Sequence, residues 1–190
     1  MVKVGFIVEG FCDRAVLSSK AFQQMVDGMG LFVVGDVSNA KGKNNLCNDV
    51  AVSLAQILRD KGADHIIVLR DLDELADLEA AQLEVIQAND ITLCVAVREL
   101  EAWFLADSTT LSTIFKTNFF FEYPEQEQNP KETLKNLSQR FRNGRGIDDE
   151  RKFTNLMIAN GFTIQRAAEH PNCPSARYFL GKLQTLASAN

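Results

Sequence analysis

The chain has 190 residues and a formal net charge of -5, and 46% of its residues are hydrophobic, 24% charged and 8% aromatic. This composition supports a hydrophobic core and excludes an intrinsically disordered chain. The sequence contains no apolar run of membrane-spanning length, and its first residues lack the pattern of a signal peptide. We therefore expect a cytoplasmic protein without a membrane anchor.

Residues 1–110 alternate between strand and helix patterns. Apolar runs rich in β-branched residues predict four strands, at residues 2–8, 31–37, 63–69 and 91–97. Helical periodicity predicts helices between them, at residues 11–27, 44–61 and 75–88. Continuously apolar strands that alternate with helices are typical of a parallel sheet covered on both faces. We expect a Rossmann-like, three-layer α/β/α domain with a four-stranded, mainly parallel sheet.

The strand pattern ends near residue 98, and the remaining predicted elements are helices. They lie at residues 99–105, 110–115, 131–141, 148–160, 164–170 and 175–187. Residues 118–130 include two prolines and predict an irregular connection. We expect residues 111–190 to form a helical C-terminal extension packed on the α/β domain of residues 1–110.

Acidic residues are concentrated in the first part of the chain. Residues 1–110 contain nine Lys and Arg against 17 Asp and Glu, whereas residues 111–190 contain 11 against eight. An excess of carboxylates disfavours direct binding of phosphate, unless some of them hold divalent cations that face the phosphate.

Several of these acids follow the ends of predicted strands, namely Glu9, Asp36, Asp71, Asp73, Glu99 and Glu101. Because the carboxyl ends of parallel strands meet at one edge of the sheet, we expect most of these side chains to lie together. Asp13, on the first turn of the helix after Glu9, can face the same edge. Clustered carboxylates need compensating charge and Mg²⁺ prefers oxygen ligands, so the pattern predicts a divalent-metal site. The alternative is that some of the acids only stabilise helix N-termini, namely Asp13, Asp73, Glu74 and Glu99.

Two short motifs resemble a known catalytic module. They are Glu9-Gly10-x-x-Asp13 after an apolar strand and, two strands later, the segment IIVLRDLD at residues 66–73. Together they resemble the Toprim domain, the metal-dependent module of bacterial primases, type IA and II topoisomerases and OLD-type nucleases. A closer resemblance, to a Toprim-like bacterial family of about this length, rests on VAVRELEAWFLAD at residues 95–107, Asn129-Pro130-Lys131 and Cys173-Pro174-Ser175. This resemblance covers most of the chain and implies a Toprim-like α/β/α fold.

The resemblance also implies roles for individual residues. In Toprim enzymes the glutamate after the first strand is a metal ligand or general acid/base, and the Asp-x-Asp motif binds Mg²⁺. These positions correspond here to Glu9 and to Asp71 with Asp73, while Asp13 matches an additional acidic ligand of OLD-type nucleases. Glu101, and after it Glu99, are our further candidates from their place behind the fourth strand. The candidate catalytic residues are thus Glu9 and Asp71, and the candidate metal ligands are Glu9, Asp13, Asp71, Asp73, Glu101 and Glu99.

A site of this kind suits phosphodiester cleavage, since two divalent ions about 4 Å apart stabilise both the attacking and the leaving oxygen. We expect a Toprim-type nuclease that uses Mg²⁺ or Mn²⁺ and acts on nucleic acid. A topoisomerase is disfavoured, because it would need a positioned tyrosine and a strand-passing body. Primase activity is disfavoured as well, because the glycine that follows the Asp-x-Asp of primases is absent after Asp73. No Walker A motif occurs, so an ATPase acting with this chain, in DNA repair or phage defence, would be a separate partner.

Basic side chains near the acids are candidates for contact with a nucleic-acid backbone, namely Arg70, Arg98, Lys41 and Lys43. A second basic group lies later in the chain, at Arg140, Arg142, Arg145, Arg151 and Lys152. Both groups have a plainer explanation. Arg70 and Arg98 can neutralise neighbouring carboxylates, and the second group can be a solvated helix face.

Other conspicuous side chains have a structural explanation. Trp103, Phe104 and the Phe119-Phe120-Phe121 run are predicted to pack in the core rather than to stack on bases. The four cysteines have no Cys-x-x-Cys spacing, so we interpret them as structural thiols rather than as a zinc site.

Two further functions fit the same acidic residues. Nucleotide-sugar transferases and HAD-type phosphatases also place Asp-x-Asp after a strand and bind Mg²⁺ or Mn²⁺, although in the phosphatases it usually follows the first strand. The other alternative is a non-catalytic, metal-binding accessory subunit that regulates a partner ATPase or nuclease.

Overall fold

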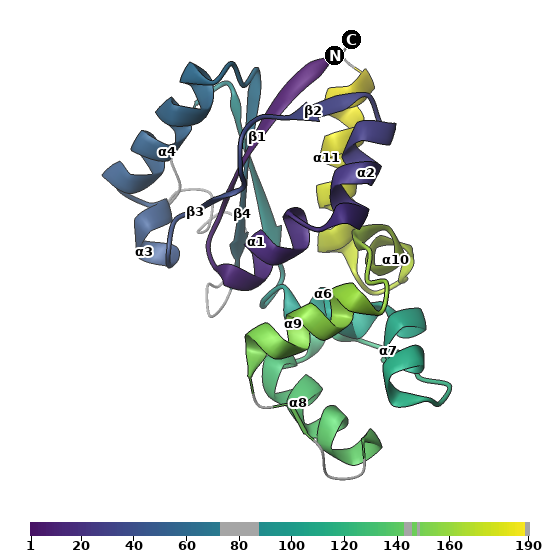
Figure 1. The fold of residues 1–190 in the computed structure, drawn as a ribbon. Helices are drawn as coiled ribbons and strands as arrows, with labels where there is room; N and C mark the ends of the chain where they lie inside the picture. The colour runs from purple at the N-terminus through teal and green to yellow at the C-terminus, as the bar shows by residue number, and fades with distance from the viewer. Residues whose placement is uncertain (73–87, 143–145, 148, 189–190) are drawn as a thin grey trace.

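A computed structural model describes residues 1–72, 88–142, 146–147 and 149–188. Within this part of the chain the sheet has five parallel strands: β1 (Val2–Val8), β2 (Leu31–Val33), β3 (Ser38–Asn39), β4 (His65–Asp71) and β5 (Ile91–Ala96). The strand order is β2-β1-β4-β5, and β3 also pairs with β1 (Figure 1). The predicted α/β class with a parallel sheet is confirmed.

The strand predicted at residues 31–37 is divided into two strands. β2 pairs with the beginning of β1, where Leu31 is opposite Val2, and β3 pairs with its end, where Ser38 is opposite Ile7. Between them the chain leaves the ladder at Gly35, whose φ of 64° is in the left-handed region that glycine tolerates best. Within the described residues the sheet therefore has five strands rather than four, and one edge of it is built from two short pieces.

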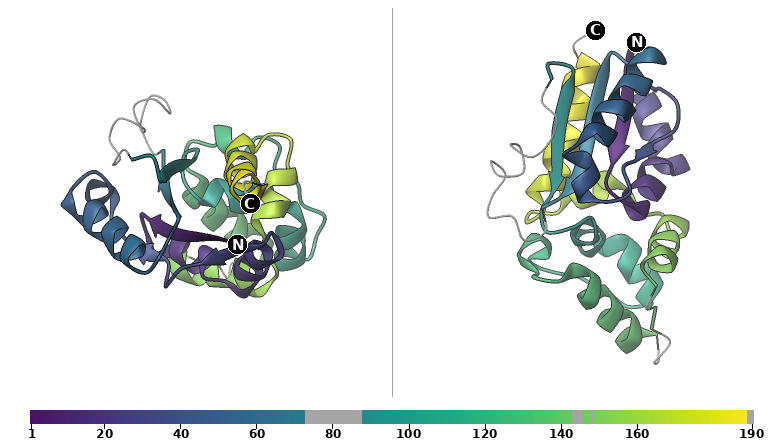
Figure 2. Two further views of the ribbon diagram at one scale, coloured as in Figure 1. Left: turned by 90° about the horizontal axis from the view of Figure 1, so that it is seen from above. Right: turned by 90° about the vertical axis from the view of Figure 1, so that its left-hand side faces the viewer.

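Helices lie on both faces of the sheet and beyond the carboxyl ends of its strands (Figures 1 and 2). The helices on the faces are α1 (Phe11–Leu17), α2 (Lys20–Gly28), α3 (Lys43–Leu46), α4 (Asp49–Asp60) and α11 (Pro174–Ser188). Those beyond the strand ends are α6 (Glu101–Ala106), α7 (Ser108–Phe115), the 3₁₀ helix η1 (Pro124–Gln126), α8 (Pro130–Phe141) and α9 (Glu150–Ala159). The short helix α10 (Ile164–Glu169) packs against α6 and α11. None of the described helices combines the length and the apolar character needed to cross a membrane.

Two of the predicted helices are each divided by a polar residue that caps a new helix. The Ser19 hydroxyl accepts a hydrogen bond from the backbone N–H of Phe22 at 3.3 Å and starts α2. The Asn48 side chain accepts one from the backbone N–H of Val50 at 2.9 Å and starts α4. Such caps satisfy backbone donors that a helix start leaves free, so they favour a new helix over the continuation of the old one. The helix predicted at residues 75–88 falls almost wholly outside the described residues.

The two faces of the sheet pack into separate apolar cores. Alternate β1 residues Val4, Phe6 and Val8 face the larger core, which α1, α2, α6 and α11 complete. Ile7 of β1 and Ile66 of β4 face the smaller core beneath α3 and α4. Figure 1 shows α3 and α4 on one side of the sheet and α2 and α11 on the other. This arrangement is the predicted three-layer α/β/α architecture.

The larger core extends from the sheet into the helical part of the chain. Trp103 of α6 is fully buried, and its ring centroid lies 5.6 Å from that of Phe179 on α11. The Trp103 indole N–H donates to the hydroxyl of Ser175 at 2.8 Å, and that hydroxyl donates to Glu125 at 2.6 Å. The prediction of core packing is confirmed for Trp103, Phe104 and Phe119, whereas Phe121 is only partly buried and Phe120 is 60% exposed. The Cys173-Pro174-Ser175 segment thus joins the start of α11 to α6 and η1.

Candidate metal centre

A cavity of about 340 Å³ lies at the carboxyl edge of the sheet. Glu9, which directly follows β1, and Asp71, the last residue of β4, both line it. The Glu9 carboxylate accepts a hydrogen bond from the backbone N–H of Asp71 at 3.4 Å. The two residues lie together because β1 and β4 are adjacent parallel strands with Val8 opposite Leu69. Two of the three strand-end positions carried over from the Toprim motifs therefore share one site, and the third, Asp73, lies outside the described residues.

Asp13 lines the same cavity from the first turn of α1. Its Oδ2 accepts the backbone N–H of Gly10 at 2.9 Å, which fixes the carboxylate at the helix start. Its Oδ1 is buried and has no hydrogen-bond partner among the described residues. Burial, together with the charges of Glu9 and Glu150, raises the pKa of Asp13 to about 7 against the lowering effect of the Gly10 hydrogen bond.

Glu101 reaches the cavity from the first turn of α6 and is only 6% exposed. Burial, and next the charges of Glu99 and Glu150, raise the pKa of Glu101 to about 8. The start of α6 is held against β4, because the backbone N–H of Leu100 donates to Asp71 Oδ1 at 3.0 Å. That bond also orients the Asp71 carboxylate, and four predicted ligands from four segments line the same cavity.

Glu150 and Cys12 complete the cavity, and both were missed by the sequence prediction. The Cys12 thiol donates to Glu150 Oε1 at 2.9 Å and accepts a hydrogen bond from the Thr154 hydroxyl at 3.0 Å. One ligand atom from each of Cys12, Glu101 and Glu150 lies within 4.8 Å of the other two. No signal in the sequence relates Glu150 to the other acids, because it follows the strand region by about 50 residues and opens a helix where an acid is ordinary.

Two of the acids predicted to join the site, Asp36 and Glu99, do not line the cavity. Asp36 does not end a strand at the carboxyl edge but is exposed in the break between β2 and β3, and it does not line the cavity. The edge position at that end of the sheet is taken by Asn39 instead. Glu99 lies beside the site rather than in it, since its carboxylate accepts the backbone N–H of Lys131 at 2.8 Å and supports the start of α8.

Of the basic residues predicted to contact nucleic acid, some line the cavity and others do not. Arg70 is 1% exposed and its Nε donates to the backbone carbonyl of Asp71, so it is an internal residue and not a contact for nucleic acid. Lys41 lines the cavity, whereas Lys43 is exposed at the start of α3 and Arg98 is half-buried in the loop after β5. Arg151, from the second predicted basic group, also lines the cavity, with its guanidinium 4.7 Å from the centre of the Phe11 ring.

A lysine partly compensates the acids. The Lys131 ammonium forms an ion pair with Glu150. Burial by itself raises the pKa of Glu150, but the hydrogen bond from Cys12 and the contact with Lys131 together lower it below its ordinary value. Burial likewise lowers the pKa of Lys131, but the contact with Glu150 raises it above its ordinary value. One acid of the site is therefore ionised and paired, while the raised pKa values of Asp13 and Glu101 indicate that these two carry protons near neutral pH when no cation is present.

The donor set fits a divalent metal ion. Carboxylate oxygens are the preferred ligands of Mg²⁺ and Mn²⁺, and the thiol of Cys12 additionally suits softer divalent ions. A cation at this place would compensate Asp13, whose buried Oδ1 has no partner among the described residues, and would favour the charged forms of Asp13 and Glu101, which burial alone disfavours. Among the described residues, Cys12, Glu101 and Glu150 have ligand atoms close enough to one another to hold one ion, and the predicted ligands Glu9, Asp13 and Asp71 line the same cavity.

No protein-family model and no curated protein matches the chain. Among solved structures, the chain is similar to the C-terminal region of the Burkholderia pseudomallei OLD protein, with a TM-score of 0.44 and 14% identity over 96% of this chain and 99% of that one. The function proposed below therefore rests on the chain's own residues.

Proposed function

We propose that the protein is a divalent-metal-dependent nuclease of the Toprim type, with Mg²⁺ or Mn²⁺ held by Glu9, Asp13, Asp71 and Glu101. One observation carries the proposal: Asp13, whose Oδ1 is buried and has no partner among the described residues, lines a cavity that four other carboxylates share. A buried carboxylate oxygen without a partner is costly unless a cation or a proton compensates it. A structural cap would not need the other four acids around the same cavity.

Nuclease chemistry would use the chain's residues in distinct ways. In hydrolysis of a phosphodiester, water attacks phosphorus, the bond to the leaving oxygen breaks, and the leaving oxygen takes up a proton. Bound divalent ions would stabilise the charge on the attacking and leaving oxygens. Glu9 is the carboxylate that would move the proton, since the backbone N–H of Asp71 fixes one of its oxygens. Lys41 and Arg151 bring positive charge to the cavity, where it would attract a phosphate.

A cleavage assay tests the proposal. Supercoiled plasmid, single-stranded DNA and single-stranded RNA are incubated with the protein in Mg²⁺ or Mn²⁺, with EDTA as the blank. We expect cleavage that EDTA abolishes and that Glu9→Gln and Asp71→Asn each reduce at least about 100-fold. Asp36→Asn is the matched control, because this acid is exposed outside the cavity and its loss leaves the activity unchanged.

Three other outcomes would contradict the proposal. Cleavage that survives in Glu9→Gln and Asp71→Asn would locate the activity elsewhere. Hydrolysis of p-nitrophenyl phosphate without attack on any nucleic acid would indicate a phosphatase. Metal binding by a folded protein that cleaves none of these substrates would support the accessory-subunit alternative, and a pull-down for a separate ATPase partner would then follow.

A further inference from the structure

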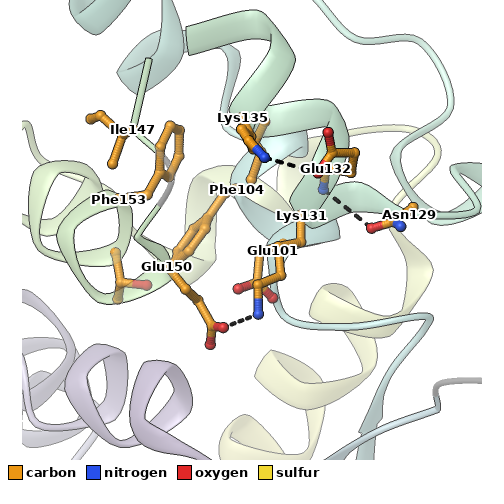
Figure 3. A pocket seen from close by; sticks show the side chains of 11 residues that line it. Glu101, Phe104, Asn129, Lys131, Glu132, Lys135, Ile147, Glu150 and Phe153 are labelled. Atoms are coloured by element: carbon orange, nitrogen blue, oxygen red, sulfur yellow. Dashed lines mark hydrogen bonds and ion pairs between the residues drawn. The ribbon is translucent and has the colours of Figure 1, made fainter. Parts of the chain in front are cut away.

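A second cavity, of about 240 Å³, adjoins the candidate metal centre between α6, α8 and α9. Glu101 and Glu150 line both cavities, so the two share a wall of carboxylates. Figure 3 shows these two side chains at one end of the second cavity, with Lys131 between them. The two cavities are therefore direct neighbours.

The far side of this second cavity is apolar. Phe104, Leu134 and Phe153 are buried there, and Ile147 is half-buried at the side (Figure 3). The Phe104 and Phe153 ring centres are 6.4 Å apart with an angle of 41° between the planes, so the two rings are tilted rather than stacked on each other. Aromatic and aliphatic walls of this kind suit a flat, apolar-faced ring system.

The charges of the second cavity disfavour an anion. Lys131 is paired with Glu150, and the ammonium of Lys135 lies 3.7 Å from the carboxylate of Glu132. Each of the two lysines that line the cavity therefore already has an acidic neighbour. Glu101 is a third acidic residue in the lining, so the acidic residues outnumber the lysines. A phosphate is consequently expected at the metal ions rather than here, and the second cavity is left for a neutral group.

A polar side chain at the rim can contact the edge of a ring. Asn129 caps α8, its Oδ1 accepting the backbone N–H of Glu132 at 3.2 Å, which fixes the orientation of its amide. Thr154 of α9 also lines the cavity, but it is fully buried and its hydroxyl donates to Cys12, so it supplies wall rather than a free donor. The cavity is also smaller than the roughly 300 to 1,000 Å³ typical of sites for drug-sized ligands, so it suits a single ring system rather than a whole nucleotide.

We infer that the second cavity receives the base of the nucleotide next to the phosphate held at the metal centre, an inference that rests on the proposed nuclease function. A base inside a stacked duplex cannot enter such a cavity, because it must first leave the stack. The substrate class is therefore single-stranded nucleic acid, or a duplex with an unpaired or flipped nucleotide at the cleavage point. The Asn129-Pro130-Lys131 segment acquires a role here, since it starts α8 at the cavity rim.

The first experiment removes one base at a time from the substrate. A single strand of about 12 nucleotides is prepared with one abasic position moved along its length, and binding in Ca²⁺ and cleavage in Mn²⁺ are both measured. We expect one position adjacent to the cleaved bond at which loss of the base weakens binding and lowers kcat/KM by roughly 5- to 150-fold. An equal, small effect at every position would overturn the inference.

The second experiment fills the cavity from the protein side. Ile147→Trp introduces a large ring from a half-buried position, and Val52→Trp on the exposed surface of α4 is the matched control. We expect Ile147→Trp to reduce kcat/KM for the intact strand to the value of the abasic strand, and to leave the abasic strand unaffected. The two losses are then non-additive, as expected when they remove the same contact. Fully additive losses would overturn the inference.

The two proposals fail in distinguishable ways. Metal-dependent cleavage with no position-specific effect of base loss contradicts the base site and leaves the nuclease intact. Position-specific binding in Ca²⁺, abolished by Ile147→Trp but without cleavage, supports the base site and contradicts the nuclease. Absence of both binding and cleavage in a folded protein overturns both.

Discussion

The Cys12 thiol donates a hydrogen bond to the Glu150 carboxylate across 138 residues of sequence, at 2.9 Å. This contact joins α1, the helix that follows β1, to α9 in the helical part of the chain. Thr154, one turn after Glu150, donates to the same sulfur at 3.0 Å. The candidate metal centre therefore lies between the sheet and the helical part, and both must be folded for the site to exist.

Stability without metal is expected to fall as the pH rises. Because burial raises the pKa of Asp13 to about 7 and that of Glu101 to about 8, both groups are protonated in the folded chain at pH 5 and lose a proton at a higher pH than in the unfolded chain. The unfolded state releases its protons first, so stability declines from about pH 4 to about pH 8, by an amount on the order of a few kcal/mol. Urea unfolding in EDTA at a series of pH values measures this decline.

The variants of these residues isolate their contribution. Asp13→Asn and Glu101→Gln are expected to be more stable than the parent protein at pH 8 in EDTA and to lose that advantage near pH 4, because the neutral amide avoids the burial of charge. Asp36→Asn, at an exposed position, serves as control. A stability difference between variant and parent that does not change with pH would contradict the explanation.

Divalent ions are expected to reverse this trend. Mn²⁺ or Mg²⁺ at about 100 times its dissociation constant stabilises a folded protein by about 2.7 kcal/mol, and protons compete for the same carboxylates. We therefore expect the increase in Tm on adding the ion to be larger at pH 8 than at pH 6. Thermal unfolding with and without EDTA measures it, and an equal increase in Asp13→Asn or Asp71→Asn would show that the ion binds elsewhere.

Thiol reactivity should single out one cysteine. Cys47 is exposed, whereas Cys12, Cys94 and Cys173 are buried. Burial raises the pKa of Cys94 to about 12 and also raises the pKa values of Cys12 and Cys173. Because the thiolate is the reactive form, Ellman's reagent is expected to titrate one thiol quickly in the native protein and the other three only after unfolding. Loss of the fast phase in Cys47→Ser identifies it, and a second fast thiol would contradict the burial of the others.

The approach of α4 to the sheet depends on a glycine in β1. A Cβ added at Gly5 would lie 2.9 Å from the nearest side-chain carbon of Leu58. Gly5→Ala is therefore expected to destabilise the protein by about 1 to 3 kcal/mol through overpacking. Gly28→Ala is the matched control, since no atom lies within 4 Å of a Cβ at that position. Equal urea midpoints for Gly5→Ala and the parent protein would show that α4 shifts without cost.

Much of the fold follows from local patterns in the sequence. Strands β1, β4 and β5 lie within about two residues of their predicted bounds, because buried parallel strands are continuously apolar and turn residues bound them. The divided edge strand and the divided helices were missed. Each break depends on a single residue: Gly35 leaves the strand with a positive φ, and Ser19 caps a new helix. The apolar pattern continues through both positions, so it does not indicate these breaks.

The candidate site was predicted in part for a similar reason. Glu9 and Asp71 end neighbouring parallel strands, so their meeting follows from sheet geometry once the strands are known. The burial of Asp13 and the exposure of Asp36 could not be inferred, because each is an acid a few residues after a predicted or observed strand. Only the packing around each residue distinguishes them. The burial of Arg70, a candidate contact for nucleic acid because it is a basic residue beside the acids, likewise does not follow from its neighbours in the sequence.

Short-range periodicity thus specifies the strands of this chain, the parallel sheet and two of its clustered acids, since each depends on residues a few positions apart. The return of α9 to the sheet places Glu150 beside Cys12 and Glu101, and no local pattern encodes that contact. It results from the packing of distant helices into one core, where the burial of many apolar side chains outweighs the cost of bringing the carboxylates together.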